Sequence, residues 1–233
     1  KPTPPPAPMR GPARGPLPVL RVLLEAGGRV DAVNVNRSNA LMMAAMNGHV
    51  EACEVLIDAG SEVNHRNQSG QTVLSLAAGQ GLTALCARLL DTRADVDWPD
   101  VTGNTPLMLA ALQGHVDTSL ALLERGADVR IANSQGHTSL TLAAEKGLTA
   151  VCTALIAAGA GLDVQTANGS TALLLAAQME HSDCCVALVA AKADVDVADS
   201  AGARPLIAAA GRGLDEACVR LIDAGADVSI TNS

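Results

Sequence analysis

The sequence predicts an all-α solenoid in which short helix–turn–helix units stack in one direction, and two observations lead to this fold. The first is a 33-residue repeat: every thirty-third residue from Leu23 to Leu221 is leucine, and a second leucine column runs from Leu41 to Leu206. The second is composition, because the 233 residues include one Trp and no Phe or Tyr. Compact cores of this size normally use aromatic side chains, whereas thin stacked layers can be filled by Ala, Leu and Val.

Each unit is expected to contain two helices and a turn, which the unit around residue 110 illustrates. Thr105 can cap an inner helix that begins at Pro106, and Gly114 is expected to end this helix in a left-handed conformation. An outer helix is expected at about 117–125, and residues 100–103 form one arm of a turn. Helices of about ten residues are marginal alone, so the units must stack to bury their apolar faces.

The chain divides into a proline-rich start and a repeat domain. Eight of the eleven prolines lie in residues 1–18, so we expect residues 1–16 to be a linker or an N-terminal cover in extended polyproline conformation. A ligand for an SH3-type domain is a further alternative, because the segment has Pro-x-x-Pro spacings. Residues 17–33 form a half repeat, and the full repeats, called repeats 1 to 6, are 34–66, 67–99, 100–132, 133–165, 166–198 and 199–231.

The half repeat supplies one outer helix, expected at 18–26. Its residues Leu20, Leu23 and Leu24 should face repeat 1, yet the proline-rich run replaces the inner helix that would flank them. Monomeric proteins rarely leave such apolar patches bare. We therefore expect residues 1–16, an upstream segment or a partner to cover this end.

Short motifs recur at fixed places in the repeats. They are Gly-x-Thr-Pro-Leu at 103–107, Ala-Ala in all six repeats, Gly-His at 48–49 and 114–115, and Gly-Ala-Asp-Val at 126–129 and 225–228. With the 33-residue period, this pattern resembles the ankyrin repeat family over residues 20–233. The resemblance implies helix pairs with β-turn or hairpin fingers, and histidines at 49, 115 and 181 that bridge neighbouring turns.

Several residues depart from the family pattern. Glu180 and Lys192 in repeat 5 and Arg93 in repeat 2 replace glycines at left-handed positions, which costs a non-glycine residue about 1–2 kcal/mol. Arg37 replaces a glycine in repeat 1. Repeat 5 is therefore expected to be the weakest. No repeat has the family's histidine after the leucine of the inner helix, so the hydrogen bonds of that histidine must be absent or replaced.

The cysteines follow the repeat. Five of the six occupy one position on the inward face of the outer helices: Cys53, Cys86, Cys152, Cys185 and Cys218, with Ser119 completing the column. Stacked helices lie roughly 8–10 Å apart, and a disulfide needs Cα atoms within about 7 Å, so these thiols are expected to stay reduced. Cys184 should point to another face of its helix than Cys185. Reduced thiols suit a cytoplasmic protein, with the nucleus as an alternative.

Other functions are not favoured by the sequence. The net charge of −8 disfavours nucleic-acid binding, and no run of 18 apolar residues suits a membrane span. Neither a phosphate-binding loop nor a C-x-x-C pair occurs, so we expect no cofactor, no metal site, no small-molecule substrate and no enzymatic activity. The chain is expected to be a monomer and, since it begins at Lys1, a fragment. Asn64 lies in a motif that resembles sites of an asparaginyl hydroxylase.

The resemblance implies a scaffold or adaptor that binds a protein or peptide partner in a concave groove lined by turn tips and inner helices. An alternative is a targeting or regulatory array of a larger enzyme or channel. Candidate partner-binding residues are Asn36, Met46, Asn47, Gln80, Trp98, Asn104, Leu112, Gln113, His137, Glu145, Lys146 and Met179. Trp98 is the expected aromatic anchor, because tryptophan is enriched among binding hot spots; the alternative is that it only packs across the turn.

Overall fold

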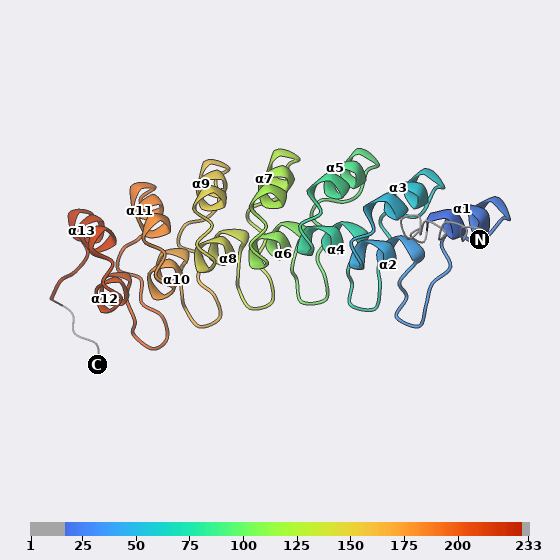
Figure 1. Ribbon diagram of the computed structural model, residues 1–233. Helices are drawn as coiled ribbons and strands as arrows, with labels where there is room; N and C mark the ends of the chain where they lie inside the picture. Colours follow the sequence, from blue (N-terminus) through green and yellow to red (C-terminus); the bar gives the residue numbers. More distant parts are fainter. Residues whose placement is uncertain (1–16, 230–233) are drawn as a thin grey trace, which may run out of the picture.

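Paired helices form an arc in the computed structural model, which describes residues 17–229 (Figure 1). The outer helices are α1 (Leu17–Glu25), α3 (Val50–Asp58), α5 (Thr83–Asp91), α7 (Val116–Glu124), α9 (Thr149–Ala157), α11 (Ser182–Ala190) and α13 (Asp215–Asp223). The inner helices are α2 (Ala40–Met46), α4 (Val73–Gly79), α6 (Pro106–Leu112), α8 (Ser139–Glu145), α10 (Ala172–Gln178) and α12 (Pro205–Gly211). Residues 17–229 contain no strand, only one isolated bridge between Ala132 and Thr138. The all-α prediction is confirmed.

The core follows the repeat columns. Leu41, Leu74 and Leu140 are fully buried, and the paired alanines of each inner helix lie between neighbouring inner helices. Helix α8 contacts α6 on one side and α10 on the other, with Ala143 and Ala144 fully buried between them. Small side chains here let the helix axes approach closely, and this explains how a core without Phe or Tyr stays dense.

Most inner helices begin at a side-chain cap. The hydroxyl of Thr105 accepts a hydrogen bond from the Met108 amide, with Pro106 at the first helical position, as the sequence predicts. In repeats 2 and 4, Ser75 and Thr141 occupy the place of the missing histidine and form capping boxes with Thr72 and Thr138. Local capping thus replaces the absent histidine in these two repeats. Arg204 provides no side-chain cap for α12.

Neighbouring repeats meet through two alternating kinds of turn contact. The Nε2 atom of His115 hydrogen-bonds the Gly79 carbonyl oxygen at 3.1 Å, and that of His181 hydrogen-bonds the Glu145 carbonyl oxygen at 3.0 Å. These bonds join repeat 2 to 3 and repeat 4 to 5, which confirms the bridging role for both histidines. His49, at the same place in repeat 1, is exposed. The even repeats carry leucine at this place: Leu82, Leu148 and Leu214.

The four substituted glycine positions all have left-handed backbone. The φ angles are 59° at Arg37, 67° at Arg93, 66° at Glu180 and 70° at Lys192. The conformations expected for Glu180, Lys192 and Arg93 are confirmed. Glu180 has room for a side chain because the next repeat places Leu214, not histidine, against this turn, and the Glu180 carboxylate pairs with Arg212 at 2.8 Å.

Replacing Glu180 by glycine should stabilise the array. Glycine adopts φ of 66° without steric cost, so we expect Glu180→Gly to raise the free energy of unfolding by about 1 kcal/mol. The lost ion pair with Arg212 is exposed and contributes little. The measurement is urea unfolding, with Arg212→Gln as the control that removes only the ion pair. An unchanged or lowered unfolding midpoint for Glu180→Gly would contradict the strain argument.

The N-terminal end is only partly described. Leu17 and Leu20 are half-buried and pack against the core of repeat 1, and Leu24 is also half-buried. The side chain of Leu23 and all of residues 1–16 lie outside the described residues. The linker, cover and SH3-ligand alternatives for residues 1–16 therefore stay predictions.

The cysteine column faces the core. Cys53, Cys86, Cys152 and Cys185 are fully buried, and Cys218 is half-buried at the end of the array. This placement confirms the inward position expected from the repeat. The helix spacing that is expected to keep the column cysteines apart does not apply to Cys184. This residue is also fully buried, and its Sγ atom lies 4.0 Å from that of Cys152. Cys184 faces the preceding repeat, whereas Cys185 lies in the column.

Candidate protein-binding surface

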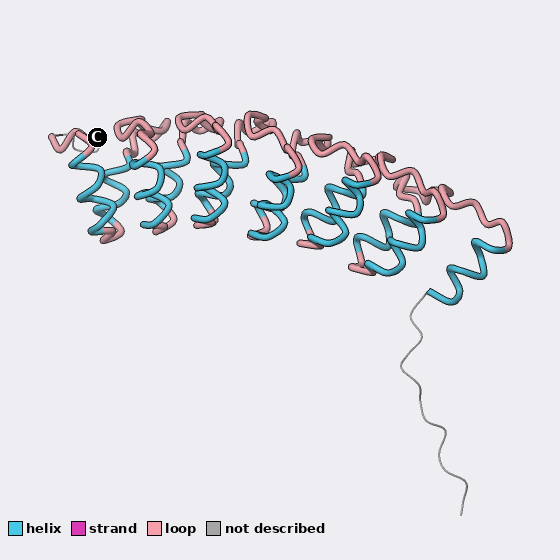
Figure 2. The backbone as a smooth tube through the Cα atoms, turned by 90° about the horizontal axis from the view of Figure 1, so that it is seen from above, coloured by secondary structure: helices cyan, strands magenta, loops and turns pink. Residues whose placement is uncertain are grey.

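The array has two long surfaces. The outer helices lie on the convex side of the arc, and the long loops that precede the inner helices project from the opposite side (Figure 1). Figure 2 shows these loops in a row along one edge. We call them fingers; they are residues 33–38, 66–71, 99–104, 132–137, 165–170 and 198–203. The fingers together with the exposed parts of the inner helices are called the concave surface.

Side chains within each finger fix its shape. The Asp100 carboxylate accepts hydrogen bonds from the amides of Thr102 (2.8 Å) and Asn104 (2.9 Å). In the next finger, the side-chain oxygen of Asn133 accepts from the amides of Gln135 and His137, both at 2.9 Å. Aspartate and asparagine are the residues that stabilise such turns. The fingers are therefore short, ordered loops.

Backbone hydrogen bonds join one finger to the next. The Val101 amide donates to the Ser69 carbonyl at 3.0 Å, and the Ser134 amide donates to the Thr102 carbonyl at 3.0 Å. Equivalent bonds link the other fingers: Gln68 to Asn36, Ala167 to Gln135 and Ser200 to Asn168. A partner would therefore meet a preorganised edge, which reduces the entropy lost on binding.

The predicted helix residues gather at the C-terminal ends of the inner helices. Met46 and Met179 are 44% and 51% exposed, and Leu112 and Glu145 are half-buried. The remaining residues of this group are exposed: Asn47, Gln80, Gln113 and Lys146. Repetition of the helix pair brings all eight to one side of the array, one or two from each of repeats 1 to 5.

The predicted finger residues form some of their hydrogen bonds within and between the fingers. Asn36 is exposed, and its carbonyl accepts the Gln68 amide. The side chain of Asn104 donates to Thr102 and accepts a 2.7 Å bond from Asn133. His137 is half-buried, with Nδ1 3.4 Å from the hydroxyl of Thr141. The side chains of Asn104 and His137 thus stabilise the fingers by hydrogen bonding, and this leaves fewer of their polar atoms for a partner.

The side chain of Trp98 packs against a residue of the preceding finger. It is half-buried in the arm that enters the third finger, and the Arg66 guanidinium carbon lies 5.2 Å from the ring centroid. Arg66 also donates to the carbonyl oxygens of Gly70 at 3.1 Å and Pro99 at 3.0 Å. One ring face is therefore covered by a cation–π contact that links the second and third fingers, and the role of Trp98 as an aromatic anchor stays a prediction.

Further apolar side chains on the concave surface extend the predicted set. Val35 and Val101 are 88% and 69% exposed, and Val33 and Met43 are also exposed. Val35 and Val101 occupy the same finger position two repeats apart, so the 33-residue alignment contains a signal for them. Met43 stands where later repeats carry leucine or alanine, and only the geometry at repeat 1 reveals its exposure.

The convex surface has a different character. Helices α3, α5, α7, α9 and α11 expose no large hydrophobic side chain. Their outer faces carry ion pairs between repeats instead, from Arg88 to Asp58 and from Arg125 to Asp91, both at 2.8 Å. Other exposed large hydrophobics of the described chain lie at its two ends: Val22 in α1, Val219 and Ile222 in α13, and Val228 after it.

Comparison with known proteins agrees with this architecture. A family model described as ankyrin repeats in three copies matches residues 13–97, 41–133, 85–164 and 140–232. The chain belongs to the ankyrin repeat family. The crystal structure of an ankyrin repeat domain from Acinetobacter baumannii AYE is 30% identical, with a TM-score of 0.72 over 80% of this chain and 98% of the other. A search of curated proteins gives no match. Ankyrin repeats are generally protein-interaction modules.

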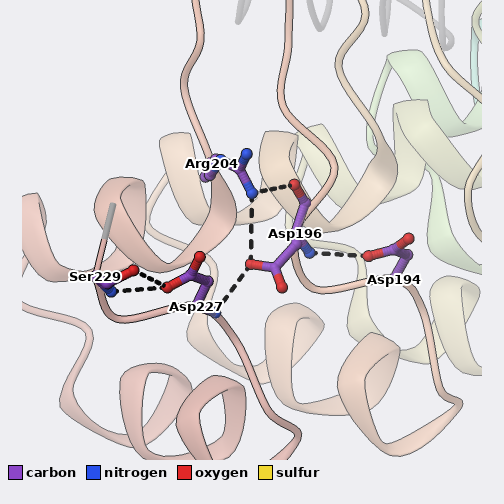
Figure 3. Close-up of polar contacts among 5 residues, drawn as sticks. All are labelled: Asp194, Asp196, Arg204, Asp227 and Ser229. Atoms are coloured by element: carbon purple, nitrogen blue, oxygen red, sulfur yellow. Dashed lines mark hydrogen bonds and ion pairs between the residues drawn. The ribbon is translucent and has the colours of Figure 1, made fainter. Parts of the chain in front are cut away.

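A ladder of acidic and amide side chains links the ankyrin repeats behind the fingers. The side-chain oxygen of Asp31, Asn64, Asp97, Asp163 or Asp196 accepts a backbone amide of the following repeat at 2.8–3.1 Å. Figure 3 shows the last of these contacts, where Asp196 also meets the Arg204 guanidinium. Burial raises the pKa of Asp97, and the amide of Asp128 that donates to it opposes this rise.

The ladder is interrupted between repeats 3 and 4. Arg130 occupies the ladder position and binds the Asp128 carboxylate of its own turn, with Nε 2.9 Å from Oδ1. Repeat 4 places Leu148, and not histidine, against repeat 3. This junction of the ankyrin array therefore lacks both polar bridges that strengthen others. Asn64 keeps its place in the ladder and donates to the Arg93 carbonyl; its hydroxylation stays a prediction.

Restoring the ladder should strengthen this junction. Arg130→Asn gives the side chain an oxygen that can accept the Gly161 amide, as Asn64 accepts the Asp95 amide. We expect the free energy of unfolding to rise by about 1 kcal/mol, the usual net value of one hydrogen bond. Urea unfolding measures it, and Asn64→Arg is the reciprocal control, expected to lower the value. A shift of the midpoint in the same direction by both substitutions would contradict a stabilising role of the ladder.

Two further findings concern the described residues 17–229. They contain no group of three or more His, Cys, Asp or Glu side chains that could hold a metal ion. None of their helices is long and apolar enough to span a membrane.

Proposed function

We propose that this ankyrin array is a scaffold or adaptor whose concave surface binds a peptide or protein segment with apolar side chains, mainly over repeats 1 to 3. One observation carries the proposal. Between the terminal outer helices α1 and α13, exposed large hydrophobic side chains occur on the concave surface and none on the outer helices: Val33, Val35, Met43, Met46, Val101 and Met179. Single exposed apolar residues are ordinary, whereas a one-sided distribution is typical of an interaction surface.

The chemistry of the surface supports an apolar partner segment. Val35 and Val101 stand at finger tips, and Met43 and Met46 lie on α2 behind the first finger. Methionine side chains adapt to differently shaped partners. Exposed amides of Asn47, Gln80 and Gln113 provide a polar rim, and hydrogen bonds at such a rim add specificity. Few basic residues lie among them, so a polyanion is not favoured.

Localisation and assembly are part of the same proposal. The described cysteines are all free, and most lie deep in successive layers. Free buried thiols in this number support a reducing compartment, so we propose the cytoplasm, with the nucleus as the alternative. We propose that the array acts as a monomer without a catalytic role.

A peptide selection tests the binding surface. Peptides from a random display library are selected on the immobilised protein and their affinities are measured in solution by calorimetry. Met46→Glu and Val101→Glu should each weaken binding by roughly tenfold or more, because an unpaired charge would be desolvated against apolar groups. Glu54→Lys and Arg88→Glu, which reverse a charge on the convex surface, are the controls and should have little effect. Loss of binding only in the convex variants would overturn the proposal.

A further inference from the structure

Two thiols meet between the outer helices of repeats 4 and 5. The Sγ atom of Cys152 in α9 lies 4.0 Å from that of Cys184 in α11, and the Thr149 hydroxyl lies 3.3 Å from the same Cys184 sulfur. Both cysteines are fully buried. The sulfur atoms are close to van der Waals contact, and the pair joins Cys152 of the column to Cys184 outside it.

We propose that Cys152 and Cys184 are a redox-active pair that a hydroperoxide oxidises to a disulfide, which covalently joins repeats 4 and 5. The disulfide would close a long loop that contains all of α10. It would also fix the junction that carries the concave residues Glu145, Lys146 and Met179. Oxidation thereby couples the redox state of the cell to the rigidity of this part of the array.

The junction of repeats 2 and 3 is an internal comparison. It places Thr83 and Thr118 where repeats 4 and 5 have Thr149 and Cys184, and the two hydroxyl oxygens are 2.7 Å apart. Cys86 there occupies the position of Cys152. The fold therefore accepts threonine at the Cys184 position, so packing alone does not explain why this position carries a cysteine.

The surroundings make Cys184 the more acidic thiol. The pKa of Cys184 is lowered because the Cys152 thiol and the Thr149 hydroxyl donate hydrogen bonds to its sulfur, against the opposing effect of burial. The Cys152 pKa is raised because that thiol donates its proton to Cys184 and is buried. Burial raises the pKa of Cys53 to about 11 and of Cys86 to about 12. Since thiolates are the reactive form, we assign the nucleophilic role to Cys184, whose sulfur also contacts Thr149 beside the surface cavity.

A surface cavity lies beside residues that neighbour this pair. It has a volume of about 260 Å³ and is lined by Gly147, Thr149 and residues 180–183, which precede and begin α11. Thr149, which lines the cavity, also contacts the Cys184 sulfur through its hydroxyl at 3.3 Å. A hydroperoxide is small enough to enter this cavity, and the proposal requires a local opening at Thr149 through which it reaches the sulfur. The left-handed Glu180 on the cavity wall, with φ of 66°, lowers the cost of a local opening.

The oxidation proceeds in two steps. The Cys184 thiolate attacks one oxygen of hydrogen peroxide, so that an S–O bond forms, the O–O bond breaks and hydroxide leaves. Cys152 then attacks the Cys184 sulfur: the S–S bond forms, the S–O bond breaks, and the departing hydroxide takes the Cys152 proton. The two sulfurs lose two electrons in total, and the peroxide is reduced to two waters, since the first hydroxide takes up the proton that Cys184 released on ionisation.

The test treats the folded protein with hydrogen peroxide at neutral pH, blocks remaining thiols under denaturing conditions and maps a non-reducing digest by mass spectrometry. A cross-linked peptide pair containing Cys152 and Cys184 is expected, two hydrogens lighter than the separate peptides and lost on reduction. The melting temperature of the oxidised protein should rise by roughly 5 °C or more. Cys185→Ser, which introduces the residue of the Ser119 position, should retain the cross-link and so assign it to Cys184.

Cys184→Thr is the decisive variant because Thr118 shows that the site accepts threonine. It should lose the cross-link and the rise in melting temperature, and Cys86→Ser should keep both. The proposal is wrong if peroxide converts Cys184 of the folded wild type to sulfinic acid without the cross-link. It is also wrong if the cross-link forms only after unfolding, or if Cys184→Thr shows the same peroxide-dependent stabilisation.

Discussion

Gly147→Ala is expected to lower the free energy of unfolding by about 2–5 kcal/mol, whereas Gly114→Ala should lower it by about 1–2 kcal/mol. Both glycines end an inner-helix turn with left-handed backbone, at φ of 69° and 80°. A Cβ atom at position 147 would lie 2.5 Å from Nδ1 of His181, while one at position 114 would have nothing within 4 Å. The difference between the two variants isolates the steric contribution of the histidine.

A double substitution tests this explanation. His181 must move if position 147 gains a methyl group, and its 3.0 Å hydrogen bond to Glu145 is then lost. Leucine occupies the histidine position in repeats 2, 4 and 6, so Gly147→Ala combined with His181→Leu should recover most of the steric cost. Urea unfolding of the four variants of the cycle gives the coupling energy. Equal losses in Gly147→Ala and Gly114→Ala, or no coupling, would refute the interlocking contact.

Trp98→Ile is expected to weaken binding of a selected peptide about thirtyfold or more, which corresponds to about 2 kcal/mol. Ile131 occupies the same position in the next repeat, so isoleucine should be accepted without loss of the fold. Arg66 holds the indole ring in place, and an already ordered aromatic side chain loses little entropy when a partner covers its free edge. Affinity by calorimetry and melting temperature are measured on the same samples.

Arg66→Gln is the companion to this variant. It removes the cation–π contact and should weaken peptide binding less than Trp98→Ile does. If Trp98→Ile leaves the affinity unchanged, the indole serves only to pack the second and third fingers against each other. A melting temperature lowered in parallel with the affinity would assign the effect to stability.

The repeat columns predicted most of the fold because each column repeats one structural environment. The inner helix at 106 and the outer helix near 117 were predictable to within a residue or so, since a cap, a proline and a glycine mark their ends. The left-handed backbone at Arg93, Glu180 and Lys192 was also predictable, because position in the repeat fixes the turn. The backbone stays left-handed at these positions even though arginine, glutamate and lysine disfavour this conformation.

The binding surface was less predictable, because the exposure of a side chain depends on which neighbouring fingers and repeats cover it. Asn104 and His137 are polar residues at finger positions, yet the structure uses them within the fingers. Met43 occupies a column that is mostly leucine and is exposed at repeat 1. The contact between Cys152 and Cys184 joins two different columns, so inspection of single columns could not reveal it.

The central claim, that partners bind the concave surface, is tested most directly by NMR of methionine methyl groups. Met43, Met46 and Met179 are exposed on this surface, whereas Met42 and Met108 are buried and serve as internal controls. Titration of the methyl-labelled protein with a selected peptide should shift the Met43 and Met46 resonances strongly and leave those of Met42 and Met108 nearly unchanged. A peptide that binds with full affinity while none of the exposed methyl resonances moves would contradict the account.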